Sequence, residues 1–185
     1  MKSANERRAW TVGHSTLPID DFVALLKRHG IRALADVRRF PASRKHPQFN
    51  ADALERSLRE AGIDYAAFTE LGGRRRARPD SRNTAWRNES FRGYADYTET
   101  AAFEAAFLRL SDLIQKKQAA IMCAEGLWWR CHRALISDQL KVKGFEVLHI
   151  LPDGEVAAHP YTSAARVSGG KVYYGPGDDL LGRLG

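Results

Sequence analysis

Two hydropathy patterns alternate along the chain, and together they predict repeated strand–helix units. Short, nearly continuous apolar runs are typical of buried strands, and they occupy residues 9–13, 31–38, 63–68, 119–124 and 145–151. Between them, apolar residues recur at the three- and four-residue spacing of a helix face, and a glycine or basic residue often closes the pattern. These segments predict helices over residues 19–30, 51–62, 101–117 and 131–144.

This order of elements predicts the α/β class, specifically a three-layer α/β/α fold with a mostly parallel sheet of about five strands. Strands covered by helices on both faces also explain why the strand runs are continuously apolar. We expect one α/β domain over residues 1–160. Residues 161–185 break the pattern and are expected to form a C-terminal tail, or a small hairpin around "SGGK", packed on that domain.

Composition narrows the environment and the partners. The 185 residues are 44% hydrophobic and 28% charged, contain two cysteines, and carry a net charge of +7. No apolar run approaches the ~20 residues of a membrane span, and the first residues lack a secretory apolar region. We therefore expect a cytoplasmic protein with free thiols, no membrane partner, and a preference for anions.

Polar loops follow each of the first four predicted strands: "GHST" at residues 13–16, "DVRRFPASR" at 36–44, "TELGGRRRAR" at 69–78, and "CAEGLWWRCHR" at 123–133. Ligands of parallel α/β sheets bind at the carboxyl ends of the strands. The four loops are therefore expected to form one basic pocket, although polar loops are also simply the usual solvated connections.

The fourth loop carries the densest chemistry. Cys131, His132 and Arg133 open a predicted helix, where backbone N–H groups bind anions and lower the pKa of a thiol. Arg133 can hold a phosphate through two parallel hydrogen bonds. The alternative is that Arg133 forms a structural ion pair with Glu125 or Asp36.

The candidate catalytic residues are Glu125 as general base, His14 as its partner in activating a water, Asp36 as the group that orients His14, and Cys131. A further set is expected to bind substrate. It comprises Ser15, Arg38, Ser43, Gly72, Gly73, Arg74, Tyr94, Cys123, His132 and Arg133. A zinc site from Cys123, Cys131 and His132 would not follow the usual paired ligand spacing, so no metal or cofactor is predicted.

Five motifs in order, "TVGHST", "DVRRFPASR", "LGG", "FRGYADY" and "CAEGLWWRCHR", resemble the family known as domain of unknown function 488. The resemblance runs from about residue 10 to residue 159. It implies an α/β domain whose loops meet in one pocket, and it implies no established reaction.

Three functions follow as hypotheses. The first is a hydrolase-like enzyme acting on a nucleotide or nucleic-acid component. The second is a non-catalytic nucleic-acid-binding protein, because Trp86, Phe91, Tyr94 and Tyr97 follow the arginine-rich loop and could stack on bases. The third is a thiol-based redox or transfer protein. The expected partner is a phosphate-bearing small molecule or nucleic acid, and the oligomeric state stays open.

Overall fold

A computed structural model describes residues 7–176, and its centre is a six-stranded sheet in the order β3-β2-β4-β1-β5-β6. The first five strands are parallel, and β6 runs antiparallel to β5. The strands are β1 (Arg8–Gly13), β2 (Ala33–Asp36), β3 (Asp64–Ala67), β4 (Ala119–Cys123), β5 (Glu146–Ile150) and β6 (Val156–Ala158). The predicted three-layer α/β/α fold is confirmed. The pattern did not predict β6, which is only three residues long and partly exposed.

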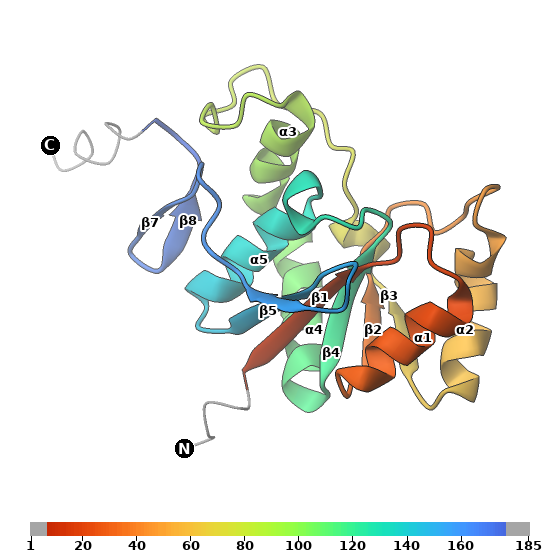
Figure 1. The fold of residues 1–185 in the computed structure, drawn as a ribbon. Helices are drawn as coiled ribbons and strands as arrows, with labels where there is room; N and C mark the ends of the chain where they lie inside the picture. The colour runs from red at the N-terminus through yellow and green to blue at the C-terminus, as the bar shows by residue number, and fades with distance from the viewer. Residues whose placement is uncertain (1–6, 177–185) are drawn as a thin grey trace, which may run out of the picture.

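Helices cover both faces of the sheet (Figure 1). One face packs on α1 and α2, and the other packs on α4 and α5. The helices are α1 (Ile19–Arg28), α2 (Ala51–Glu60), α3 (Glu89–Thr98), α4 (Ala101–Lys116) and α5 (Arg133–Val142). Short 3-10 turns join them at η2 (Pro47–Phe49), η3 (Thr69–Leu71) and η4 (Trp128–Arg130). None of the helices in the described range is long and apolar enough to cross a membrane.

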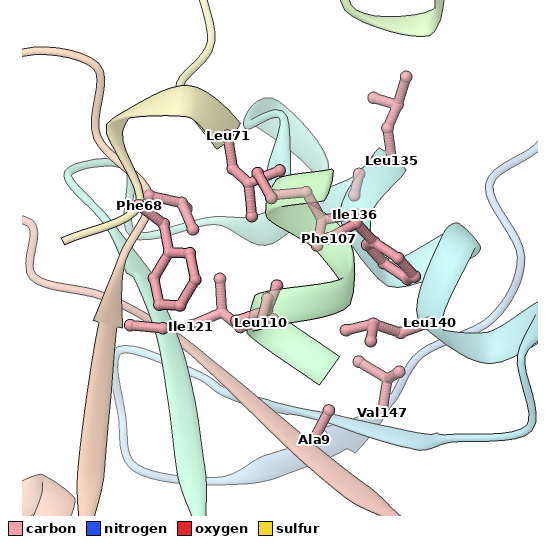
Figure 2. Close-up of a cluster of buried hydrophobic side chains, with 14 of the residues drawn as sticks. Ala9, Phe68, Leu71, Phe107, Leu110, Ile121, Leu135, Ile136, Leu140 and Val147 are labelled. Carbon is pink, nitrogen blue, oxygen red and sulfur yellow. The ribbon is translucent and has the colours of Figure 1, made fainter. Parts of the chain in front are cut away.

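The alternation of side chains along β4 decides which face each residue serves. Ile121 and Cys123 belong to the buried cluster beneath α4 and α5, while Ala120 and Met122 belong to the cluster beneath α1 and α2. Figure 2 shows Ile121 in the first cluster with Leu110 of α4 and other apolar side chains. Because successive strand residues point to opposite faces, Cys123 is directed toward α5 at the carboxyl end of the sheet.

One helix was not expected, and another begins later than expected. Helix α3 was not predicted; it begins where the Asn88 side chain accepts hydrogen bonds from the backbone N–H groups of Ser90 and Phe91, at 2.9 and 3.1 Å. Helix α5 begins at Arg133, two residues later than expected, because the η4 turn occupies the preceding residues. Cys131 and His132 therefore lie just before the helix.

The C-terminal segment ends in an antiparallel hairpin of β7 (Arg166–Ser168) and β8 (Lys171–Tyr173). Gly169 and Gly170 turn the chain with positive φ angles of 56° and 70°, which glycine adopts without steric penalty. The hairpin lies beside α5 (Figure 1), and the following Tyr174 is buried. Residues 1–6 and 177–185, the end of the expected tail, lie outside the described residues.

Candidate active site

A pocket of about 470 Å³ opens where the loops after β2 and β4 meet. Its wall contains four arginines and one acidic side chain, so its charge favours an anion. The lining residues are Arg38, Arg39, Phe40, Ala42, Gly73, Arg74, Ser90, Phe91, Tyr94, Cys123, Ala124, Glu125, Arg130, Cys131 and His132.

The two cysteines form a pair in the wall of this pocket. Cys123 ends β4, Cys131 lies two residues before the start of α5, and their Sγ atoms are 2.7 Å apart. Both residues are buried, and both are free thiols. The loop between them brings the carboxyl end of a strand to the amino end of a helix, so the thiols meet close to the N–H groups of the first helical turn.

Arg133 lies beneath the thiol pair and is 1% exposed. Its Nε donates to Cys123 Sγ at 3.0 Å, and its backbone N–H is directed at Cys131 Sγ at 3.4 Å. The guanidinium also donates to Thr11 Oγ1 at 3.2 Å and to the backbone carbonyl of Glu125 at 2.5 Å.

Within residues 7–176, Arg133 forms no ion pair with a carboxylate. The expected alternative, an ion pair with Glu125 or Asp36, is wrong: Arg133 reaches the main chain of Glu125, and Asp36 pairs with a different arginine. Burying an unpaired charge costs several kcal/mol. The thiols in contact with Arg133 can supply the missing negative charge.

The pKa values of the pair follow from these contacts. Burial opposes ionisation of Cys131, but the thiol hydrogen bond from Cys123 and the charge of Arg133 outweigh it and lower the pKa of Cys131 to about 7. Burial, with the hydrogen bond to Cys131, raises the pKa of Cys123 well above its ordinary value. Cys131 is therefore the more acidic thiol of the pair.

His132 lies beside Cys131 with its ring orientation fixed by the main chain. Its Nε2 lies 2.9 Å from the carbonyl oxygen of Val37, which can only accept, so Nε2 carries the hydrogen. Burial lowers the pKa of His132, which leaves the ring neutral and Nδ1 free as an acceptor 3.4 Å from Cys131 Sγ. Gly73 makes room for the ring, because a Cβ there would lie 2.9 Å from Nδ1.

Asp36 and His14 lie apart from the thiols, packed toward α1 and α2. Both Asp36 oxygens accept from Arg38, with Nε–Oδ1 and Nη2–Oδ2 distances of 2.8 and 2.6 Å. His14 stacks on Phe49 at 4.0 Å between ring centroids and donates from Nδ1 to the carbonyl of Ser15 at 2.9 Å. Asp36 thus orients Arg38, and the expectation that it orients His14 is wrong. The reason is that Arg38 lies between them, with Nε and Nη2 on the Asp36 oxygens and Nη1 3.4 Å from His14 Nε2. Strand alternation separates this group from the thiols, because Asp36 and Cys123 occupy opposite faces of the sheet.

Some of the candidate residues line the pocket, and the others lie outside its wall. Arg38, Gly73, Arg74, Tyr94, Cys123, Glu125, Cys131 and His132 line the pocket, whereas His14, Ser15, Asp36, Ser43, Gly72 and Arg133 do not. Ser43 Oγ accepts from the backbone N–H of His46 at 3.1 Å and fixes a turn. Gly72 is a point of close approach, since a Cβ there would lie 2.5 Å from the Cα of Arg39.

Sequence reasoning missed two groups of residues. Arg39, Phe40 and Arg130 line the pocket but did not stand out among the polar loops. The second group is the buried polar residues behind Arg133, which include Thr11 of β1 and His149 of β5. Their signal in the sequence was a polar side chain inside an apolar strand run. In the described part of the chain, no three His, Cys, Asp or Glu side chains are grouped to hold a metal ion.

Fold and site together define a class: a three-layer α/β protein with a thiol pair in an arginine-rich pocket at the strand carboxyl ends. The chain belongs to the family described as "Domain of unknown function DUF488", whose model matches residues 18–140. The predicted membership of this family is thereby confirmed. No curated protein and no solved structure matches the chain.

Proposed function

We propose that the protein is a dithiol enzyme in which Cys131 attacks an anionic substrate and Cys123 resolves the intermediate. The observation that carries this proposal is the buried Arg133, whose Nε contacts Cys123 Sγ at 3.0 Å and which has no carboxylate partner in residues 7–176. An ionised thiol is the counter-charge that this arrangement favours, and a thiolate is the reactive form of cysteine.

A second thiol beside the first favours exchange at a sulfur–sulfur bond over simple hydrolysis. The Cys131 thiolate attacks one sulfur of a substrate disulfide, an S–S bond forms, and the other substrate sulfur leaves as a thiolate. Cys123 loses its proton to the departing thiolate and attacks Cys131 Sγ, 2.7 Å away. The first half of the substrate leaves as a thiol, the second half leaves as a thiolate, and the protein, having given up two electrons, carries a Cys123–Cys131 disulfide.

The pocket supports an anionic, phosphate-bearing substrate for this step. Arg39, Arg74 and Arg130 line it without a carboxylate partner in residues 7–176. Arg74 adopts a left-handed backbone conformation, φ 60°, at this wall. Such strain in a non-glycine residue costs about 1–3 kcal/mol and is typical of functional sites.

The test uses two disulfide probes of opposite character: dianionic dithiobis(nitrobenzoate) and neutral dithiodipyridine. We expect the anionic probe to react faster than the neutral probe at low salt. This ratio of rates should fall in Arg74→Gln. It should not fall in the control Arg59→Gln, whose side chain lies on α2, away from the pocket. With one equivalent of the anionic probe, wild type should release both nitrothiobenzoate groups and become lighter by two hydrogens. Cys123→Ser should release one group and retain the other as an adduct.

The proposal is contradicted if wild type keeps a stable adduct as Cys123→Ser does. It is equally contradicted if the Cys131 alkylation rate rises with an ordinary thiol midpoint near pH 8.5, because an unperturbed thiol is not held as a thiolate at neutral pH.

A second candidate is the hydrolase-like activity on a nucleotide. The favouring observation is that Glu125 is the only acidic side chain in the pocket wall, exposed to a ligand and held by a hydrogen bond from the backbone N–H of Leu127 at 3.3 Å. Under this hypothesis Glu125→Gln abolishes turnover of nucleotide substrates but leaves the thiol midpoint unchanged. A panel of nucleotides and sugar phosphates measures turnover, and the pH dependence of Cys131 alkylation measures the thiol midpoint on the same variant.

A further inference from the structure

A line of buried polar side chains connects Arg133, the first residue of α5, to Asp138 in the same helix. Arg133 Nη1 lies 3.2 Å from Thr11 Oγ1, which lies 2.7 Å from His149 Nδ1. His149 Nε2 lies 2.9 Å from His159 Nδ1, and His159 Nε2 lies 2.9 Å from Asp138 Oδ1. All five residues are at most 1% exposed. The side chains come from β1, β5, α5 and the segment after β6, and we name this line the relay.

The Asp138 end of the relay fixes the direction of its hydrogen bonds. Asp138 accepts from the backbone N–H and the hydroxyl of Thr162, at 2.9 and 2.7 Å, and from the hydroxyl of Tyr174 at 3.0 Å. A carboxylate with these donors has acceptor positions only. His159 Nε2 must therefore carry the hydrogen that faces Asp138.

The remaining hydrogens have an assignment that gives every donor an acceptor. With a single hydrogen, on Nε2, His159 accepts at Nδ1 from His149 Nε2–H. His149 then accepts at Nδ1 from the hydroxyl of Thr11, whose oxygen accepts from Arg133. Burial, together with the neighbouring His159 and Arg133, lowers the pKa of His149 to about 2, consistent with a neutral ring. Every donor in the relay thus has an acceptor, and all bonds point from the guanidinium to the carboxylate.

We propose that the relay is a positioning device through which the C-terminal segment holds the Arg133 guanidinium against the two thiols and so sets the reactivity of Cys131. This inference rests on the proposed thiol function. Arginine does not lose its proton in proteins, so the relay orients a charge and does not carry protons to sulfur. Asp138 also supplies a distant negative charge at the other end of the line.

The relay is covered by an aromatic ring on one part of its length and meets a lysine on another. The Trp128 ring stacks on the His149 ring with 4.3 Å between centroids and an interplanar angle of 5°. Lys141 Nζ donates to the backbone carbonyl of His159 at 2.8 Å and faces the ring of Tyr161 at 5.3 Å. The titratable groups facing the relay are therefore the two thiols, Lys141 and Tyr174, and they remain in place in the variants below.

The test replaces Thr11, the link between Arg133 and His149, in the full chain. Thr11→Val preserves shape but removes the hydroxyl, and Thr11→Ser preserves the hydroxyl. We expect the midpoint of iodoacetamide alkylation at Cys131 to rise by about one pH unit in Thr11→Val, which makes alkylation at pH 7 roughly five-fold slower. Thr11→Ser should restore the wild-type midpoint.

Two results would overturn the positioning role. One is an unchanged midpoint in Thr11→Val while wild type keeps its low midpoint, in which case the dithiol function stands and only the relay fails. The other is an equal rise in both variants, because the serine retains the hydrogen-bonding group. An ordinary midpoint in wild type itself is the different result that removes the proposed function.

Nitrogen-15 NMR of the wild-type imidazoles gives a measurement that does not depend on a variant folding. The relay requires His149 and His159 both to be neutral at pH 7 with the hydrogen on Nε2. A ring protonated at pH 7, or a hydrogen on Nδ1 of either residue, would reverse a bond in the line and overturn the assignment.

Discussion

Two buried arginines lie at the carboxyl edge of the same sheet, and their partners differ in kind. Arg38 holds the carboxylate of Asp36 through two hydrogen bonds of 2.8 and 2.6 Å. Arg133 holds two thiols, a hydroxyl and backbone carbonyls. The first guanidinium has a carboxylate as its partner. The second has no carboxylate partner within residues 7–176, and the groups it contacts carry a negative charge only if a cysteine ionises.

This difference shows how one residue type serves two purposes. The Asp36–Arg38 pair is also bonded to the hydroxyl of Tyr65, at 2.8 Å, and shapes the loop after β2. Under the proposed function, the Arg133 site instead favours ionisation of a thiol that attacks the substrate. A buried neutral histidine lies beside each arginine: His14 Nε2 is 3.4 Å from Arg38, and His149 is linked to Arg133 through Thr11.

The largest predicted effect is on stability, at the carboxylate-paired arginine. Arg38→Met leaves Asp36 buried and unpaired, and we expect a loss of about 3–5 kcal/mol in the free energy of unfolding. Urea denaturation measures it, and Arg59→Gln, which removes an exposed pair with Glu55 on α2, should lose under about 0.5 kcal/mol. The double variant Asp36→Asn, Arg38→Met should recover part of the loss. A change below about 1 kcal/mol in Arg38→Met would show that the pair is not structural.

The next effect is on reactivity, at the thiol-paired arginine. Arg133→Met removes the charge that lowers the pKa of Cys131 and leaves the burial that raises it. We expect alkylation of Cys131 at pH 7 to slow at least ten-fold, with a much smaller loss of stability than in Arg38→Met, because no carboxylate is left unpaired. Arg133→Lys keeps the charge without the planar guanidinium. Its Cys131 alkylation rate should lie between the rates of wild type and Arg133→Met. Equal reactivity in Arg133→Met and wild type would remove the contrast between the two arginines.

The smallest effect is the pH dependence contributed by the histidines. Burial, together with the charge of Arg38, lowers the pKa of His14 to about 4 in the folded protein. The unfolded chain binds this proton below about pH 6.5, so the stability is complete above that pH and is lost as pH falls toward 4. The slope from one histidine is at most about 1.4 kcal/mol per pH unit. His14→Gln should reduce the slope of the unfolding free energy against pH, between pH 6.5 and 4, by up to this amount. An unchanged slope would mean that His14 is not buried as a neutral ring.

The fold could be predicted well from hydropathy, and the site only in outline. Apolar runs and helical spacing located the five parallel strands and four helices, because each signal is local. The pocket was predictable because Arg38, Arg74 and Cys131 follow strand ends, and parallel strands place their carboxyl ends at one edge. The motifs also indicated the family, whose model matches residues 18–140.

The pairing of side chains was not predictable, because it depends on strand order and register. His149 stands opposite Thr11 only because β5 lies beside β1 in this register. Asp36 is separated from Cys123 because the two strand ends present opposite faces, which depends on the residue at which each strand stops. Neither fact leaves a trace in composition or spacing.

The strand order also governs when the site can exist during synthesis. Strand β1 is made first, yet it pairs with β4 and β5, which emerge from the ribosome more than a hundred residues later. The relay then needs Thr162 and Tyr174, which come later still. Contacts this distant in sequence form slowly. Under the proposed function, the two thiols therefore gain their special reactivity only after the strands and the C-terminal segment that surround Arg133 have been synthesised and have folded.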